Sequence, residues 1–381
     1  MVKPASPFYL KITIYLLLIG LLCVLVIFAG DILIPLCYAL LLAILLLPVV
    51  KFFERHKMGR VPSILISLAL AFSLIVILVY FITSQVIGFA EDLPHIKQQL
   101  NEHYHTMQLY VRNHFNMTFR EQKDIINKAT DQISNESSGY IGETFFSLTK
   151  FIMVVLLLPV YAFLFLYYRF MLKKFILDVL PDKHEYKILD VMEESKLILQ
   201  RYLTGLMIEM AIVASINVTG FMIFGIKYAV FLGILAAILN LIPYIGMLIA
   251  TIVCMMITLT SSTELSDVLW TAVVLTAVQF IDNNLIMPKI VASRVKVNAL
   301  VSIIGVLIGG ALSGISGMFL SIPTIAILKS IFERVKPLKP WGMLLSDEND
   351  FHPETTLLPS PAEPGDNINQ KDHHKANHNK S

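Results

Sequence analysis

Polar side chains are rare in the apolar stretches of this sequence, and one group of them is closely spaced. Asp282, Asn283 and Asn284 are consecutive, and Gln279 comes one helical turn earlier, so Gln279, Asp282 and Asn283 share a helix face. One carboxylate with amides around it can coordinate a small cation or hydrogen-bond a polar solute, because hard cations prefer oxygen ligands. An acidic charge near a helix C-terminus opposes the helix dipole, which disfavours a purely structural role. We therefore predict a substrate or ion site at this group.

Two further polar residues, Glu209 and Asn217, lie in a separate apolar run. A carboxylate in hydrocarbon is costly, and it indicates a proton or cation path or an internal partner. Glu209 is only two helical turns, about 12 Å, beyond Arg201, so an equally good interpretation is that its side chain reaches the membrane surface or faces a protein partner. Asn217 lies deeper, where an amide most often hydrogen-bonds a neighbouring helix. Both residues are candidate ligands.

Two uncharged runs are each interrupted by residues that break helices. The first break covers residues 240–246, where exposed backbone groups can bind a solute, and Asn240 and Tyr244 are candidate ligands there. The second break is rich in glycine, which allows close approach or sliding of helices. The candidate hairpin and hinge residues are Pro243, Gly246, Pro288, Gly309, Gly310, Gly314, Gly317 and Pro323.

The composition of the 381-residue chain defines the class of protein that positions these side chains. Hydrophobic residues make up 56% and charged residues only 15%, against about a quarter in soluble domains, and the mean hydropathy is +0.70. This excludes an ordinary cytosolic enzyme and a disordered chain, and the net charge of +2 does not indicate nucleic acid as a partner. Catalytic motifs, phosphate loops and cysteine or metal-ligand patterns are absent from the sequence, so we predict no enzyme, no cofactor and no metal site.

The uncharged stretches predict an all-α, polytopic membrane protein, because about 20 apolar residues cross a bilayer core of about 30 Å. In the first stretch we expect two spans, 12–30 and 32–50, joined by a tight turn near Asp31 and Pro35. A polar segment after the third span is expected to form a small external helical domain. The predicted units are the first three spans (1–90), the external insert (91–146), a fourth span (147–168), a charged cytoplasmic linker (169–201), a transport core (202–335) and a disordered cytoplasmic tail (336–381).

The predicted transport core contains two uncharged runs whose lengths fit neither one membrane crossing nor two. Residues 228–263 and 297–328 are 36 and 32 residues long, which is too long for one crossing and short of the roughly 40 residues that two crossings need. Each is broken near its middle, so we predict two helical hairpins that enter the membrane and return to the same side. An ordinary span, 268–287, lies between them.

Basic residues in the short loops predict the orientation of the chain. They follow the second span, the fourth span, the span ending near Met287 and the second hairpin, which places both termini in the cytoplasm. The span and hairpin at 202–263 and those at 268–328 then have opposite orientations. Inverted repeats with broken helices that meet at the midplane are a recurrent architecture of secondary transporters.

Three sequence features resemble the autoinducer-2 exporter family of bacterial transporters. They are the Leu239–Gly246 segment Leu-Asn-Leu-Ile-Pro-Tyr-Ile-Gly, the Gln279–Pro288 segment with Asp-Asn-Asn, and the glycine-rich run that ends at Pro323. The segment Leu-Met-Ile-Glu that ends at Glu209 departs from the Gly-Gln stretch more usual in the family. The resemblance implies an inner-membrane permease of about eight segments that forms a homo-oligomer. Family members are named for export of autoinducer-2, and others resemble sodium or lithium/proton antiporters.

Three hypotheses about function follow. The leading one is a secondary transporter that exports or exchanges a small solute, such as an autoinducer-2-like signal or a related metabolite, by alternating access. The second is a sodium or lithium/proton antiporter. The third, from another class, is a membrane regulatory or scaffold protein that acts through its external insert. The predicted partners are the lipid bilayer, a small solute, and sodium ions or protons.

Overall fold

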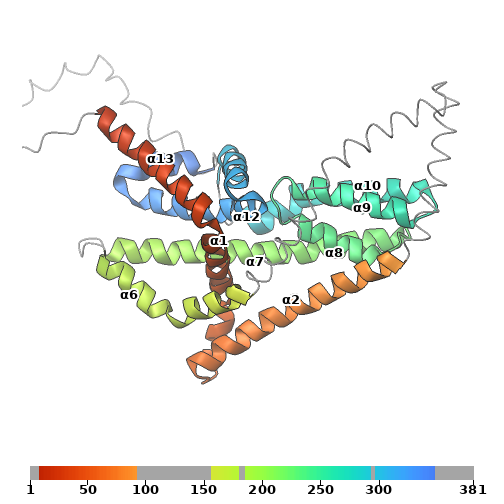
Figure 1. Ribbon diagram of the computed structural model, residues 1–381, viewed down its shortest axis with the longest axis horizontal. Coiled ribbons are helices and arrows are strands. Elements are labelled where there is room, and N and C mark those ends of the chain that lie inside the picture. The colour runs from red at the N-terminus through yellow and green to blue at the C-terminus, as the bar shows by residue number, and fades with distance from the viewer. Residues whose placement is uncertain (1–7, 92–155, 180–184, 293–296, 348–381) are drawn as a thin grey trace, which may run out of the picture.

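A computed structural model describes residues 8–91, 156–179, 185–292 and 297–347 (Figure 1). Within these ranges the regular secondary structure is helical, and the only extended pairing is an isolated antiparallel bridge between Val297 and Ser346. Five of the described helices, or six if one bent pair counts as a span, are long and apolar enough to cross a membrane. The predicted all-α membrane fold is thus confirmed. The predicted external insert and most of the tail lie outside the described residues.

The N-terminal helix differs from the prediction of two spans. α1 (Phe8–Arg55) is one continuous helix of 48 residues, so the predicted turn near Asp31 and Pro35 is wrong. Apolar residues continue on both sides of these two positions, and a proline is tolerated inside a helix of this kind when neighbouring groups satisfy the freed backbone carbonyl. At 1.5 Å per residue, α1 is about 72 Å long, over twice the bilayer core. The predicted cytoplasmic N-terminus depends on two membrane crossings in this region, and one continuous helix does not support that number of crossings.

The next two apolar segments pack against the C-terminal half of α1. α2 (Arg60–Glu91) matches the predicted third span. The predicted fourth span is a helix over Leu156–Tyr167 that bends by 66° at Tyr168 into α6 (Arg169–Val179). Buried side chains from all three segments form one apolar cluster: Ala39, Ala43, Leu46, Val50, Ile64, Leu68, Ala162 and Leu166.

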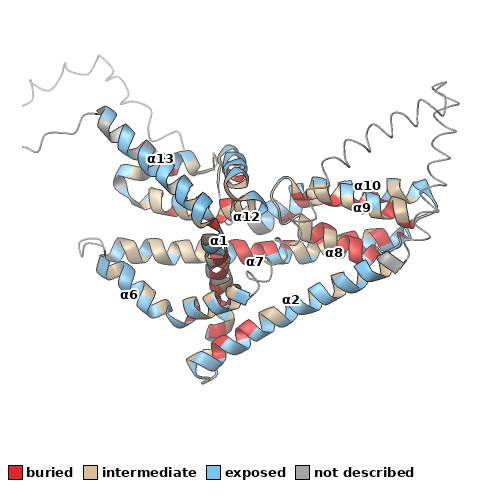
Figure 2. Ribbon diagram, viewed as in Figure 1, coloured by how far each residue is buried: buried red, intermediate tan, exposed pale blue. Residues whose placement is uncertain are grey.

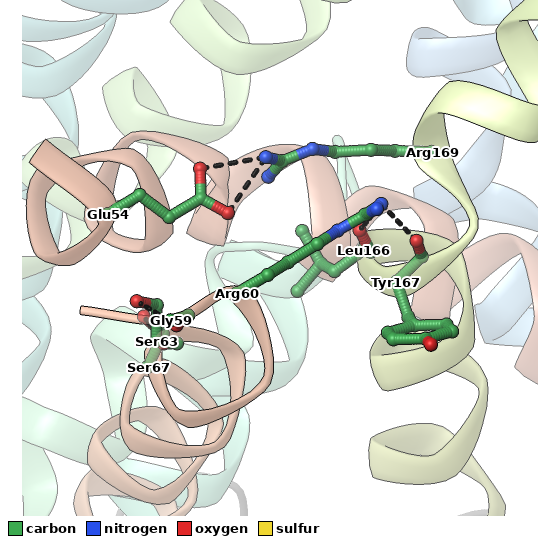
Figure 3. A network of polar contacts seen from close by, with 8 residues as sticks. All are labelled: Glu54, Gly59, Arg60, Ser63, Ser67, Leu166, Tyr167 and Arg169. Atoms are coloured by element: carbon green, nitrogen blue, oxygen red, sulfur yellow. Dashed lines mark hydrogen bonds and ion pairs between the residues drawn. The ribbon is translucent and has the colours of Figure 1, made fainter. Parts of the chain in front are cut away.

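Two arginines hold the bend at Tyr168 against the connection between α1 and α2 (Figure 3). The bend leaves the carbonyl groups of Leu166 and Tyr167 without their usual helical partners, and the Arg60 guanidinium donates to both of them. Arg169 Nη2 donates to the two carboxylate oxygens of Glu54 at 2.8 and 2.7 Å. Charge-assisted bonds of this kind are stronger than neutral ones, so they fix the direction in which α6 leaves the bundle.

We expect Glu54→Ala to lower the free energy of unfolding by about 2 kcal/mol, because it leaves the partly buried Arg169 guanidinium without its anion. Unfolding of the purified protein in detergent measures this loss. A double-mutant cycle with Arg169→Ala should give a coupling energy of about 1 kcal/mol or more. Additive effects of the two substitutions would show that the ion pair does not stabilise the bend.

The segment predicted as the transport core begins with a helix that is longer than the predicted span. α7 (Glu185–Ile223) includes the second half of the segment predicted as a linker, so the boundary drawn at residue 201 lies inside one helix. The residues before this boundary are more polar but still form helical turns, and α7 continues through them without a break. Near the start of α7, Asp190 accepts a 2.9 Å bond from Arg334, which ties this end to the last turn of α12.

The first predicted hairpin forms two short helices, α8 (Ala229–Leu239) and α9 (Gly246–Ser261). They pack on α7 and on α10 (Leu265–Ile281) around a buried apolar cluster that includes Phe221, Leu232 and Cys254. In the turn between α8 and α9, a Cβ atom on Gly246 would lie 1.9 Å from the Leu239 carbonyl oxygen. Only glycine therefore allows α9 to start this close to the end of α8.

The second predicted hairpin is α12 (Ala299–Arg334), which folds back on itself at Ser313 and Gly314. These two residues have non-helical φ and ψ angles, and φ of Gly314 is +60°. The two arms then lie against each other: the Ser321 hydroxyl in the second arm is 2.8 Å from the Gly305 carbonyl oxygen in the first. The predicted break in the glycine-rich run is thus confirmed.

Residues 336–347 correct the prediction of a tail disordered from residue 336. They form a short 3-10 turn (Lys336–Leu338) and α13 (Lys339–Leu345), each with a proline at its start, where the missing N–H costs nothing. α13 packs closely on the end of α12 through Gly342, which leaves no room for a side chain against Glu333. At the last residue of α13, the Leu345 carbonyl accepts a 3.0 Å bond from the Asn298 N–H.

The outer helices expose apolar side chains. Figure 2 shows buried residues on α7, α8 and the C-terminal half of α1, whereas α2 and α6 are largely exposed. On α2, Leu70, Leu74 and Ile77 are 60–69% exposed. Such a surface would be unfavourable in water, so it faces hydrocarbon or other apolar surfaces.

Candidate functional site

A cavity of about 500 Å³ lies in the core. Its walls come from α7, from the turn between α8 and α9 and the start of α9, from the end of α10 and the residues after it, from both arms of α12, and from the segment after α13. The lining residues are Tyr202, Leu206, Glu209, Asn240, Leu241, Pro243, Tyr244, Met247, Gln279, Asp282, Asn283, Met287, Val297, Ala299, Ser302, Ile322 and Asp347.

Asp282 lies in the cavity at the point where the chain changes from an α-helix to a π-helix. α10 ends at Ile281 and continues as two π-helical segments, η2 (Asp282–Ile286) and η3 (Pro288–Ala292). π-turns are rare and occur frequently at functional sites. The Asp282 side chain is 2% exposed, and its Oδ2 accepts a 3.0 Å bond from Asn240 Nδ2 in the first hairpin turn. This bond joins the hairpin turn to the helix that carries the carboxylate.

Glu209 brings a second carboxyl group to the same place. It lies on α7, is 8% exposed, and its carboxyl group is adjacent to that of Asp282. Glu209 therefore faces a protein partner, as one of the two interpretations of this residue predicts. Glu209 Oε2 and Asp282 Oδ1 are both buried without a hydrogen-bond donor among the described residues. Two adjacent buried carboxyl groups, each with one oxygen that lacks a donor, can bind a proton or a small cation.

Amides and a phenol complete the polar part of the cavity wall. Gln279 Nε2 donates to Asn283 Oδ1 at 2.9 Å, as the i,i+4 spacing predicts, and both residues line the cavity beside Asp282. Tyr244 lines it from the hairpin turn, where its φ of +64° turns the backbone toward α9. These groups can donate and accept hydrogen bonds, so the cavity suits a small polar solute with hydroxyl or carbonyl groups.

Two predicted ligands do not line the cavity. Asn284 is exposed, and its side chain donates to the Phe280 carbonyl one turn earlier at 2.7 Å. Asn217 is 2% exposed on α7, about two helical turns beyond Glu209, and its Oδ1 has no partner among the described residues.

The predicted hinge residues lie at several places. Pro243 lines the cavity, and Gly246 begins α9. Pro288 begins η3, directly after the π-turn of Asp282. Gly309, Gly310, Gly314 and Gly317 lie in α12 around its break, and Pro323 is buried in its second arm.

Three polar residues of the cavity wall were not predicted: Tyr202, Ser302 and Asp347. Tyr202 is 3% exposed and precedes Glu209 by two turns on α7, so the helical spacing from Glu209 was a usable signal. Ser302 is an ordinary small residue in an apolar run and gives no signal. Asp347 reaches the cavity only because Ser346 pairs with Val297, a contact that local sequence does not reveal.

The apolar helices and the polar cavity between them define a multi-pass membrane transporter. Comparison with known proteins then gives the family: the model of the AI-2E family transporters matches residues 14–336, and the chain belongs to this family.

The chain is also similar to several proteins described as transporters. "Putative transport protein YrrI" of Bacillus subtilis is 25% identical over 310 residues, which cover 78% of this chain and 85% of YrrI. YueF of the same organism is 25% identical over 316 residues, or 81% of this chain and 85% of YueF. A protein of Haemophilus influenzae with the same description is 25% identical over 88% of this chain and 97% of its own length. The residues matched by the family model include both hairpins and every residue of the cavity wall except Asp347.

Proposed function

We propose that this protein is a secondary transporter that moves a small polar solute through the cavity and couples the movement to a proton or small cation at Glu209 and Asp282. One observation carries the proposal: Glu209, Asp282 and Asn240 come from three separate elements and meet in a single cavity. A charged group at membrane depth is costly, and a purely structural contact could be made by apolar residues at lower cost.

The solute that we propose is small and rich in hydroxyl or carbonyl groups. A cavity of about 500 Å³ accommodates a small metabolite together with several waters. Its polar wall contains amide, hydroxyl and carboxyl groups, which suit a hydroxylated solute. An autoinducer-2-like molecule, which the family name implies, belongs to this chemical class.

A second candidate function is sodium or lithium/proton antiport. The observation that favours it is the pair of adjacent carboxyl groups with unpartnered oxygens, which is a suitable site for exchange of a proton for a small cation. In this version the cavity is the aqueous path of the ion. The two versions share the carboxyl pair and differ in the transported solute.

We propose that alternating access uses the two hairpins. Glu209 on α7 and Asp282 at the start of η2 each bring one carboxyl group to the cavity, and the next hairpin begins 20 and 17 residues later, at Ala229 and Ala299. This correspondence supports an inverted repeat with its binding site between the two halves. The hairpin turn at Asn240 touches Asp282 directly, so binding at the carboxyl pair can be transmitted to the hairpin.

We also propose that the protein is in the inner membrane of a bacterial cell with its C-terminus in the cytoplasm. The basic residues that follow α1 and the second hairpin support this orientation. We propose in addition that the exposed apolar faces of the outer helices serve in part as contacts of a homo-oligomer.

Flux measurements on the purified protein in liposomes test the proposal. A sodium or proton gradient is imposed, and uptake of a panel of small hydroxylated solutes is measured together with the internal pH. Solute accumulation that collapses when the gradient is dissipated is expected of a coupled transporter. Sodium-driven pH change without solute uptake would favour the antiporter. Flux equal to that of empty liposomes in both assays would overturn both versions.

A further inference from the structure

A second cavity, of about 420 Å³, lies apart from the transport cavity and shares none of its lining residues. It is formed by α1, the helix Leu156–Tyr167, α6 and α7. Its walls are mainly aliphatic and aromatic side chains, among them Leu40, Ile44, Leu47, Phe165, Leu172 and Leu189. An apolar space of this size fits part of a hydrocarbon chain better than a polar metabolite.

The rim of this cavity is basic. Arg169, Lys173 and Lys196 line it together with one acidic residue, Glu193. Glu193 forms an exposed 3.1 Å ion pair with Lys196, and Lys51 and Lys173 are also close enough to interact with it electrostatically. Arg169 is also paired with Glu54, so the three cations exceed the two carboxylates that contact them by one charge, and this surplus positive charge is suited to a phosphate group.

One donor at the rim has no acceptor. Arg169 Nη2 contacts both oxygens of Glu54, whereas Arg169 Nη1 is buried without a hydrogen-bond partner among the described residues (Figure 3). A buried guanidinium N–H that lacks an acceptor is costly. A phosphate oxygen at the rim would satisfy this donor, and Arg169 is well shaped for such a contact.

The cavity lies beside a bent segment that has the features of a membrane-interface helix. The apolar helix Leu156–Tyr167 ends at the 66° bend, and α6 continues from it with Arg169, Lys173 and Lys174 among exposed apolar residues such as Phe170 and Phe175. A helix with lysines and aromatic residues that bends away from a membrane span is typical of a segment lying in the membrane interface. The basic rim is on this helix and on the facing part of α7.

We propose that this cavity binds one anionic phospholipid, with the headgroup phosphate at Arg169, Lys173 and Lys196 and part of an acyl chain between α1, α6 and α7. The bound lipid would hold α6 against α7, the helix that carries Glu209. The site is separate from the transport cavity, and the proposal does not depend on the identity of the transported solute.

The test measures binding of phosphatidylglycerol and phosphatidylcholine, with identical acyl chains, to the full-length protein in detergent. Native mass spectrometry gives the affinity and thermal unfolding gives the stabilisation. We expect tighter binding and greater stabilisation by phosphatidylglycerol. The double variant Lys173→Ala/Lys196→Ala should bind phosphatidylglycerol about 20-fold more weakly, since each basic residue near a phosphate contributes about fivefold. Leu172→Trp, which fills the apolar space, should weaken binding of both lipids.

Matched controls separate this site from general charge effects. Lys174→Ala/Lys339→Ala removes the same charge at two residues that do not line the cavity, and it should bind phosphatidylglycerol like the wild type. Equal losses in the two double variants would overturn the proposal. So would equal stabilisation by inorganic phosphate alone, which would indicate an ion site without a lipid. A change of oligomeric mass in Leu172→Trp without loss of lipid would overturn it as well, because a second copy of the chain would then occupy the cavity.

Discussion

Asp282→Asn should reduce gradient-driven transport at least 30-fold, which corresponds to about 2 kcal/mol in the barrier to the transport step. The substitution keeps the shape of the side chain and its contact with Asn240, but it removes one of the two carboxyl groups that would hold the coupling ion. Flux in liposomes, normalised to the amount of reconstituted protein, measures the effect. Glu209→Gln should cause a loss of similar size, because the ion would need both groups.

The structure supplies a matched control for this experiment. Asn284→Ala changes a residue only two positions from Asp282, on the same π-helical segment, that is exposed and does not line the cavity. We expect its flux to be within about twofold of the wild type, since its side chain bonds only within its own helix. Wild-type flux in Asp282→Asn would contradict the site assignment. A similar loss in Asn284→Ala would mean that the effect arises from the helix and not from the cavity.

Gly317→Ala should destabilise the protein by more than about 3 kcal/mol and remove most of the folded material. A Cβ atom at Gly317 would lie 1.9 Å from the carbonyl oxygen of Gly309 in the opposite arm of α12, so the two backbones would have to separate. Backbone atoms cannot move aside as a flexible side chain can, which places this substitution beyond the usual 1–3 kcal/mol cost of overpacking. The yield of monodisperse protein and its unfolding temperature in detergent measure the effect.

Gly88→Ala is the control for the hairpin substitution. Gly88 lies in α2, and a Cβ atom there would meet nothing within 4 Å. Alanine is the better helix former, so this variant should be as stable as the wild type or slightly more stable. If Gly317→Ala also folded with unchanged stability, the close contact between the two arms of α12 would be wrong.

Much of the fold could be predicted because hydrocarbon imposes a simple rule on the sequence. A membrane helix needs a run of apolar residues, and a break in such a run needs glycine or proline. The hairpin turns at 240–245 and at Ser313–Gly314 follow directly from this rule. The rule is less reliable when the break in the apolar run is slight. One acidic residue and one proline do not interrupt α1.

The residues of the candidate site could be predicted from the sequence, but their arrangement in space could not. Asp282 and Glu209 were found because charge is rare in apolar runs, and Gln279 and Asn283 because they share a helix face with Asp282. That Glu209 and Asp282 would lie side by side depends on how α7 packs against the π-helical segment, which no local pattern specifies. The π-turn itself could not be predicted either, because Asp282, Asn283, Asn284 and Pro288 indicate a weakened or interrupted helix without specifying its type.

The pairing of Ser346 with Val297 affects the order in which the site can form during synthesis of the chain. Asp347, the last residue of the cavity wall, leaves the ribosome after both carboxyl groups, both hairpins and α13 have been made. Contacts between segments so far apart in sequence form late, because loop closure must come first. A nascent chain therefore carries Glu209 and Asp282 into the membrane before their cavity is complete, and its final wall is added only when synthesis has passed residue 347.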